Sequence, residues 1–174
     1  MLNVEYKAEL REPELARAAL ERIGAEHEAT LRQIDTYYHV PTGRLKKRDV
    51  PGRPSEYIVY ERADRPSPKL SKFSLLDTSA FQERYGQRPL PVLVVVEKSR
   101  ELLLLGDVRI HLDDVKDLGR FLEIEALVSP RQHVAQCHSI VAHLREKLGP
   151  TIGEPISSSY MDLMLAERET SEHT

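Results

Sequence analysis

The stretch that decides the fold is Leu2-Asn3-Val4-Glu5-Tyr6-Lys7-Ala8-Glu9-Leu10. Its even-numbered residues are apolar or aromatic, and its odd-numbered residues are polar or charged. Because successive side chains of a β-strand point to opposite faces, this pattern predicts a strand with one apolar face and one charged face. The charged face would carry carboxylates and a lysine side by side.

Two later segments repeat this alternation. They are Arg109-Ile110-His111-Leu112-Asp113 and Phe121-Leu122-Glu123-Ile124-Glu125. Each gathers its charged side chains on one face of the expected strand and its aliphatic side chains on the other. If the three charged faces meet, they form a site that contains both cations and carboxylates. Such a mixture suits a metal-bound polyphosphate.

The composition limits the class of protein. The chain has 174 residues, 40% of them hydrophobic, and a formal net charge of -3, which predicts one globular domain over residues 1–174. The acidic balance predicts no binding of nucleic acid or of an acidic membrane surface. The single cysteine, Cys137, excludes an internal disulfide and a cysteine-based zinc cluster. Since no apolar stretch is long enough to span a membrane, we expect a cytoplasmic protein without a membrane partner.

Turn signals divide the chain into about eight strands, joined mainly by hairpins. Helices are expected near each end, at residues 13–23 and 130–148, where apolar residues recur at helical spacing. If these helices cover the apolar faces of the strands, the charged faces point inward. The sequence therefore predicts an α+β fold, an antiparallel eight-stranded β-barrel that forms a tunnel, with helices packed outside. A solvated charged face is the alternative, because antiparallel sheets often have one.

Cations and carboxylates recur on the predicted inward faces of six strands. The candidate cations are Lys7, Lys46, Arg48, Arg62, Lys98, Arg100 and Arg109. Lysine and arginine bind phosphate oxygens, and carboxylates become useful beside them when they hold Mg²⁺ or Mn²⁺. The sequence lacks the glycine-rich phosphate loop that ends in Gly-Lys-Ser/Thr, so strand side chains would hold the phosphates. We therefore expect a small-molecule triphosphate, such as ATP, as the partner.

These segments, in this order, resemble the CYTH family of triphosphate tunnel enzymes, which includes class IV adenylate cyclases, thiamine triphosphatases and inorganic triphosphatases. Three segments, Asn3–Lys7, Asp35–Tyr38 and Gly43–Arg48, resemble the family motifs Glu-x-Glu-x-Lys, Asp-Thr-Tyr-Phe and Leu-Arg-x-Arg. Arg109–Asp113 with Leu118–Glu125 resembles the class IV cyclase form, as does the tail Ser159–Met164. The resemblance runs over essentially the whole chain.

The resemblance implies a role for each candidate residue. The implied metal ligands are Glu5, Asp113, Glu123 and Glu125. The seven candidate cations would line the tunnel and hold the phosphates, and Lys7, Arg109 and Asp113 are the candidate catalytic residues. We expect His111 to support the site through a hydrogen bond rather than to bind metal.

The implied activity is that of a Mg²⁺- or Mn²⁺-dependent adenylate cyclase, in which the ribose 3′-hydroxyl of ATP attacks the α-phosphorus and pyrophosphate leaves. Two alternatives stay open because the same tunnel would serve them. One is hydrolysis of inorganic or thiamine triphosphate, and the other is non-catalytic binding of a triphosphate or another polyanion. Asn3 stands where the family usually has its first glutamate, which predicts weaker metal binding or the loss of one of two metals. The resemblance is compatible with a homodimer.

Overall fold

The computed structural model describes residues 1–62 and 66–173, and the side chains of these residues except that of Arg62. The strands are β1 (Leu2–Leu10), β2 (Glu26–Tyr38), β3 (Arg44–Asp49), β4 (Glu56–Arg62), β5 (Lys69–Leu76), β6 (Val92–Leu105), β7 (Val108–Val115), β8 (Gly119–Leu127) and β9 (Ile152–Pro155). The helices are α1 (Pro13–Arg22), α2 (Thr78–Tyr85), α3 (Val134–Leu148), which a 3₁₀ turn at Gly149–Thr151 follows, and α4 (Tyr160–Glu172).

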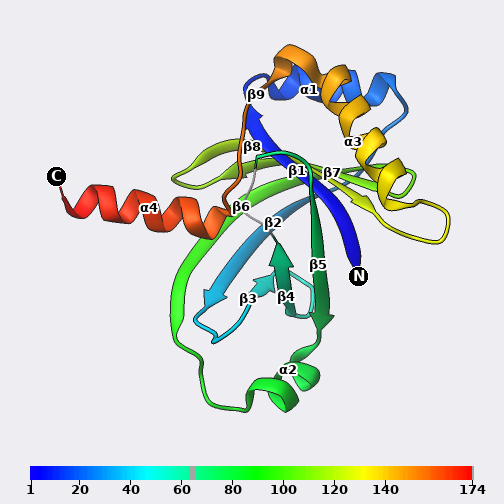
Figure 1. Cartoon of the computed structure of the whole chain (residues 1–174). Coiled ribbons are helices and arrows are strands. Elements are labelled where there is room, and N and C mark those ends of the chain that lie inside the picture. The colour runs from blue at the N-terminus through cyan, green and yellow to red at the C-terminus, as the bar shows by residue number, and fades with distance from the viewer. Residues whose placement is uncertain (63–65, 174) are drawn as a thin grey trace.

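Within the described residues, eight of the strands close into an antiparallel barrel (Figure 1). The order around the barrel is β1-β5-β4-β3-β2-β6-β7-β8, and β1 closes it by pairing with both β5 and β8. The predicted eight-stranded barrel with helices packed outside is confirmed. The sequence pattern does not predict β9, a short strand that pairs with β1 beyond a bulge between Ala8 and Leu10.

The apolar faces of the strands point out of the barrel and are covered by helices. Figure 1 shows α1 and α3 lying together over the side where β1, β7 and β8 run. Val4 and Ile124 of the barrel share one buried cluster with Leu20 of α1 and Leu144 of α3. Each such side chain stabilises the fold by about 1.5–3 kcal/mol relative to an exposed position. Since neighbouring residues alternate, this packing directs Glu5, Lys7, Glu123 and Glu125 into the barrel.

A second apolar cluster fills one end of the barrel. Val96, Val115 and Phe121, on the inward faces of β6, β7 and β8, pack with Tyr160 and Met164 at the start of α4. The remainder of α4 runs away from the barrel, as Figure 1 shows. This end of the tunnel is therefore built from the C-terminal segment of the chain.

The start of α4 is held by a reciprocal cap. The Ser159 hydroxyl accepts from the backbone N–H of Asp162, and the Asp162 carboxylate accepts from the backbone N–H of Ser159, both at 3.1 Å. Arg44 of β3 donates to the Ser159 hydroxyl and to the Asp162 carboxylate, each at 2.8 Å. These contacts fix the first turn of α4 against the barrel.

The described helices include none that combines the length and the apolar character needed to cross a bilayer.

We predict that Leu144→Ala lowers the free energy of unfolding by about 2–5 kcal/mol, because it leaves a cavity between α3 and the barrel. Urea unfolding followed by circular dichroism measures the loss. Leu15→Ala is the matched control, since Leu15 lies on α1 and is 60% exposed, and it should change stability by less than about 0.5 kcal/mol. Equal losses in the two variants would contradict the placement of α3 over the barrel.

Candidate functional site

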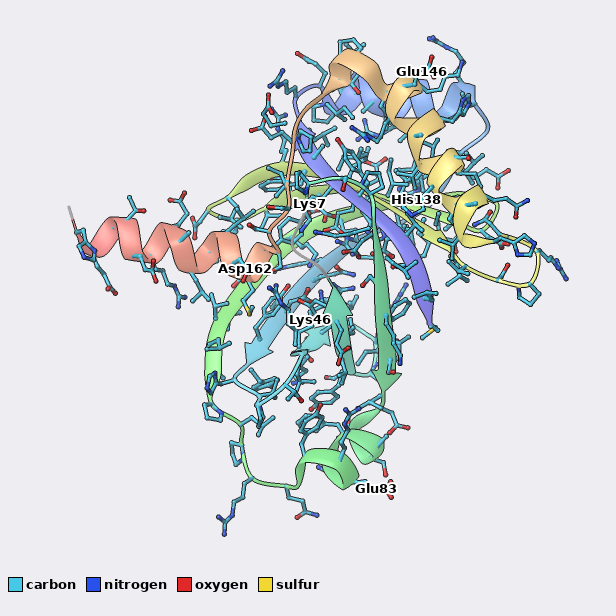
Figure 2. The ribbon with its side chains drawn as sticks, in the orientation of Figure 1. Lys7, Lys46, Glu83, His138, Glu146 and Asp162 are labelled. Carbon is cyan, nitrogen blue, oxygen red and sulfur yellow. The ribbon has the colours of Figure 1, made fainter. Side chains whose placement is uncertain are left out.

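The barrel encloses a cavity of about 300 Å³, called the tunnel below. Figure 2 shows Lys7 and Lys46 inside the barrel, whereas Glu83, His138 and Glu146 lie outside it on helices. The predicted site residues that line the tunnel are Glu5, Lys7, Lys46, Arg48, Arg100, Arg109, Glu123 and Glu125. The structure thus brings side chains from β1, β3, β6, β7 and β8 to one cavity.

The pairing of β7, β8 and β1 places charged residues in two rows across the tunnel wall. One row is Arg109, Glu125 and Glu5, and the next row is His111, Glu123 and Lys7. Carboxylates that lie directly opposite each other on neighbouring strands repel, as Glu5 and Glu125 do. A cation bound between the rows would relieve that repulsion.

His111, Glu123 and Glu125 each offer one ligand atom, and these three atoms lie within 4.8 Å of one another. His111 Nδ1 is 3.7 Å from Glu123 Oε2 and 4.0 Å from Glu125 Oε1, which is too far for a hydrogen bond. His111 is 1% exposed, yet neither ring nitrogen has a hydrogen-bond partner among the described residues. Since unpaired buried nitrogens are costly, this donor set fits a divalent cation better than it fits an empty site.

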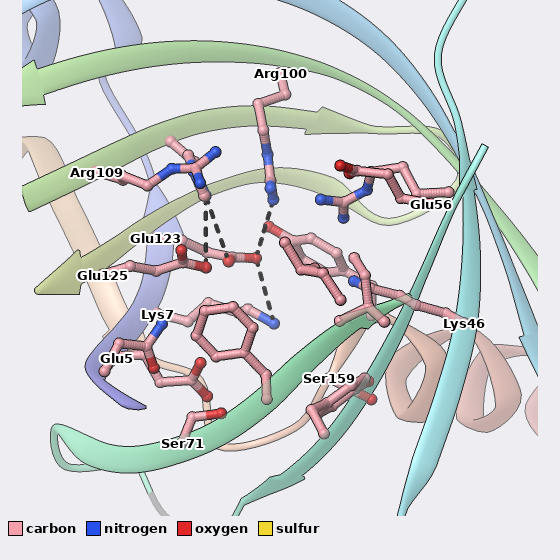
Figure 3. Close-up of a pocket in the computed structure, with 18 of the residues that line it drawn as sticks. Glu5, Lys7, Lys46, Glu56, Ser71, Arg100, Arg109, Glu123, Glu125 and Ser159 are labelled. Carbon is pink, nitrogen blue, oxygen red and sulfur yellow. Dashed lines mark ion pairs between the residues drawn. The ribbon is translucent and has the colours of Figure 1, made fainter. Parts of the chain in front are cut away.

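The protonation states favour metal binding. Burial, and then Arg100, lower the pKa of His111, so the imidazole is neutral at pH 7 and can act as a ligand. Burial alone would raise the pKa of Glu123, but Lys7 and Arg100 more than offset it and hold that pKa well below its usual range. Glu123 Oε1 lies 3.7 Å from Lys7 Nζ and 3.5 Å from Arg100 Nη2, the ion pairs drawn in Figure 3.

Asn3 also faces the tunnel, two residues before Glu5. It is buried, and its side-chain oxygen has no hydrogen-bond partner among the described residues. An amide oxygen is an uncharged ligand that hard cations such as Mg²⁺ accept. The departure from the family's glutamate therefore leaves an oxygen in the tunnel but removes a negative charge.

Asp35 organises the cations on the opposite side. Arg48 binds it with two hydrogen bonds of 2.8 Å, Lys98 Nζ donates to it at 2.8 Å, and Lys46 Nζ lies 3.2 Å away. Burial alone would raise the pKa of Asp35, but the three cations hold it well below its usual range. Asp35 is therefore charged, and it fixes cations from β3 and β6 in one place.

A second buried carboxylate, Asp113, positions Arg100. The guanidinium donates two hydrogen bonds to Asp113, at 2.8 and 2.7 Å, and the Tyr160 hydroxyl donates a third at 2.7 Å. Lys7 Nζ lies 3.9 Å from the centre of the Tyr160 ring, a cation–π distance. The end of the tunnel near α4 is thus a connected network of charged and aromatic groups.

Three predicted site residues are placed differently from the rest. Asp113 lies with Arg100 and does not line the tunnel, whereas Glu5 lines it; neither is part of the cluster of His111, Glu123 and Glu125. The Lys98 side chain is fully buried against Asp35 and does not line the tunnel. The prediction for Arg62 concerns a side chain outside the described ones, although its backbone ends β4.

Asp35, Tyr37 and Tyr160 contribute to the site. Sequence reasoning did not count Asp35 or Tyr160 among the site residues, and it favoured a packing role for Tyr37 over the stacking of a base. The sequence does contain a signal for Asp35. It is a single carboxylate on an expected strand, and the next expected strand carries Lys46 and Arg48, with which it could form ion pairs. The β2–β3 pairing places Asp35 directly opposite Arg48 and Tyr37 opposite Lys46. For Tyr160 strand alternation gives no signal, because it lies on a separate helix. Its sequence signal is its place in the tail segment Ser159–Met164, which resembles the class IV cyclase form.

The chain matches a family model and several solved structures. A model of the CYTH domain matches residues 1–160. A comparison with curated proteins finds no significant match.

The structural matches span almost the full length of both chains. The PH1012 protein from Pyrococcus horikoshii OT3 has a TM-score of 0.74 at 22% identity, over 92% of this chain and 98% of its own. A proposed adenylate cyclase from Vibrio parahaemolyticus has a TM-score of 0.73 at 16% identity, over 95% and 98%. One chain in the structure of the Schizosaccharomyces pombe Mediator head module matches with a TM-score of 0.63 at 9% identity, over 88% of this chain and 97% of its own. At these identities the likeness establishes the fold alone. Because the family model covers residues 1–160 of 174, this chain belongs to the CYTH family.

Proposed function

We propose that this protein binds a metal-complexed triphosphate in the tunnel and acts as a class IV-type adenylate cyclase, which converts ATP to cyclic AMP and pyrophosphate. The observation that carries the proposal is one cavity lined both by the cations Lys46, Arg48, Arg100 and Arg109 and by a cluster of His111 and two glutamates. CYTH proteins are triphosphate-acting enzymes, which supports the first part of the proposal.

The cations bind the phosphates. Arginine can hold phosphate oxygens with two parallel hydrogen bonds, and it does so best when its guanidinium is fixed beforehand. Asp35 fixes Arg48, and Asp113 fixes Arg100, each through two hydrogen bonds. We assign Asp113 a positioning role for this reason, and we assign Lys98 the same role through Asp35.

Glu5, Glu123, Glu125 and His111 are the residues that would hold Mg²⁺ or Mn²⁺, with Asn3 as an uncharged addition. The bound cation would neutralise phosphate charge and polarise a phosphoryl oxygen. Lys7 lies 3.7 Å from Glu123, so it connects the carboxylate cluster to the phosphates. In the cyclase reaction the 3′-oxygen bonds to the α-phosphorus, its proton is released and the bond to pyrophosphate breaks. The cations stabilise the charge that develops on pyrophosphate.

The segments that resemble class IV cyclases are also those that build the site. Arg109–Asp113 contributes the tunnel arginine, the candidate metal ligand His111 and the carboxylate that holds Arg100. The tail segment contributes Tyr160, which donates to that same carboxylate. This coincidence favours cyclisation over hydrolysis in the same tunnel.

The proposal predicts that purified protein with ATP and Mn²⁺ or Mg²⁺ produces cyclic AMP and pyrophosphate, measured by chromatography of the products. Glu123→Gln together with Glu125→Gln should reduce the rate at least about 100-fold, because both anionic ligands are lost. Glu83→Gln on α2, outside the barrel, is the control and should retain the rate.

Other products would contradict parts of the proposal. Orthophosphate from tripolyphosphate or thiamine triphosphate, without cyclic AMP from ATP, would replace the cyclase with a triphosphatase. Metal-dependent binding without any turnover would leave a binding protein. Full activity of the double variant would contradict the assignment of the metal site.

A second prediction concerns pH. Burial lowers the pKa of Lys46 to about 8, and a bound polyanion favours the charged ammonium, so binding takes up a proton. The ligand for this test is a tripolyphosphate analogue with methylene groups at both bridging positions. Between pH 7 and 9, its affinity should fall about tenfold more for the wild type than for Lys46→Arg, because arginine stays charged over this range. Titration calorimetry measures both proteins, and the comparison cancels the titration of the ligand itself. An equal pH dependence in both would contradict the role of Lys46.

A further inference from the structure

One wall of the tunnel is apolar and lies opposite the charged wall. The barrel order places β4 and β5 across from β7 and β6. On their inward faces, Tyr60 pairs with Phe73 and Ile58 pairs with Leu75, and all four side chains line the tunnel. These four residues are called the β4–β5 wall.

Ile58, Phe73 and Leu75 border the open cavity, and Tyr60 borders the cavity and also packs against the second apolar cluster. Leu75 is 47% exposed, and Ile58, Tyr60 and Phe73 are half-buried. At the other end of the barrel, the inward-facing apolar residues are covered by the start of α4. The oxygens of an inorganic triphosphate would gain nothing from contact with aliphatic and aromatic carbon, and apolar surface that stays in water is unfavourable. The wall therefore suits a ligand with an apolar part.

The β4–β5 wall and the phosphate-binding cations meet at Lys46. Its Nζ lies 5.7 Å from the centre of the Tyr60 ring and 5.5 Å from that of the Tyr37 ring. Lys46 also lies directly opposite Ile58 in the β3–β4 pairing. A triphosphate ester whose phosphates contact Lys46 would have its organic group beside this wall.

We propose that the β4–β5 wall binds the planar base of the substrate, so that the substrate is a nucleoside triphosphate rather than inorganic triphosphate. This inference rests on the function proposed above and names the residues that select the substrate within it. Tyr60 and Phe73 offer aromatic faces to a base. Arg53 and Glu56, which line the same cavity, add one donor group and one acceptor group for its polar edge.

The test compares two ligands that cannot be cleaved, ATP and tripolyphosphate analogues that both carry methylene groups at the bridging positions. Titration calorimetry with Mn²⁺ should show tighter binding of the nucleotide analogue by the wild type. Phe73→Ala should weaken it about tenfold, the usual effect of losing one stacked ring, and should leave the affinity for the inorganic analogue unchanged. Leu75→Ser, at an exposed position, should also weaken binding of the nucleotide analogue and leave the affinity for the inorganic analogue unchanged.

The matched control is Phe81→Ala. Phe81 stacks on Tyr57 at a centroid distance of 3.9 Å and does not line the tunnel, so neither affinity should change. The inference would be overturned if Phe73→Ala and Leu75→Ser bound the nucleotide analogue as tightly as the wild type. It would also be overturned if both variants lost affinity for the nucleotide analogue and for the inorganic analogue equally. If the variants keep the nucleotide affinity and the inorganic analogue still binds, the proposed function is not contradicted. If the wild type binds neither analogue, the proposed function fails, and the inference fails with it.

Discussion

The interaction on which the site depends is the contact of one buried carboxylate with three cations. Asp35 is completely buried and accepts from Arg48 and Lys98 at 2.8 Å, with Lys46 at 3.2 Å. Without that negative charge, three cations would crowd one end of a tunnel that has little water to screen them. With it, they keep a net positive charge and fixed positions. Asp35 thus links β2, β3 and β6 and prepares the tunnel for an anion.

The same logic shapes the other side of the tunnel. Glu123 forms ion pairs with Lys7 and Arg100. The Arg100 guanidinium and the Tyr160 hydroxyl both donate hydrogen bonds to Asp113. Buried charges persist only when they are paired or bound to a ligand. Among the described residues, His111 has no hydrogen-bond partner for either ring nitrogen. A metal-bound triphosphate, the ligand proposed above, would supply both an anion for the cations and a cation for the His111 cluster.

The fold follows from the sequence because alternation and helical spacing act together. Val4 and Ile124 must be covered, and helices with the apolar residues Leu20 and Leu144 are available to cover them, so the charged faces have to point inward. Alternation identifies the face on which a residue lies but not its partner across the barrel. For that reason the sequence indicates that Lys98 points inward, whereas only the structure shows that its ammonium group donates a hydrogen bond to Asp35.

The same limit applies to the candidate metal site. Glu123 and Glu125 could be predicted from parity and from the family resemblance. The place of His111 beside them depends on the register of β7 against β8, and the separation of Asp113 from them depends on Arg100 and on a tyrosine in α4. A pattern within one strand contains no information about either. The apolar wall was likewise hidden, because its four residues come from two strands whose pairing aligns them.

We have proposed that the charged tunnel binds a metal-bound triphosphate. The most direct test is a crystal structure with Mn²⁺ and the methylene-bridged ATP analogue, in which anomalous scattering locates the metal. We expect a manganese peak between His111, Glu123 and Glu125, with phosphate density against Arg48 and Arg100. A metal or a triphosphate bound only outside the barrel would contradict it.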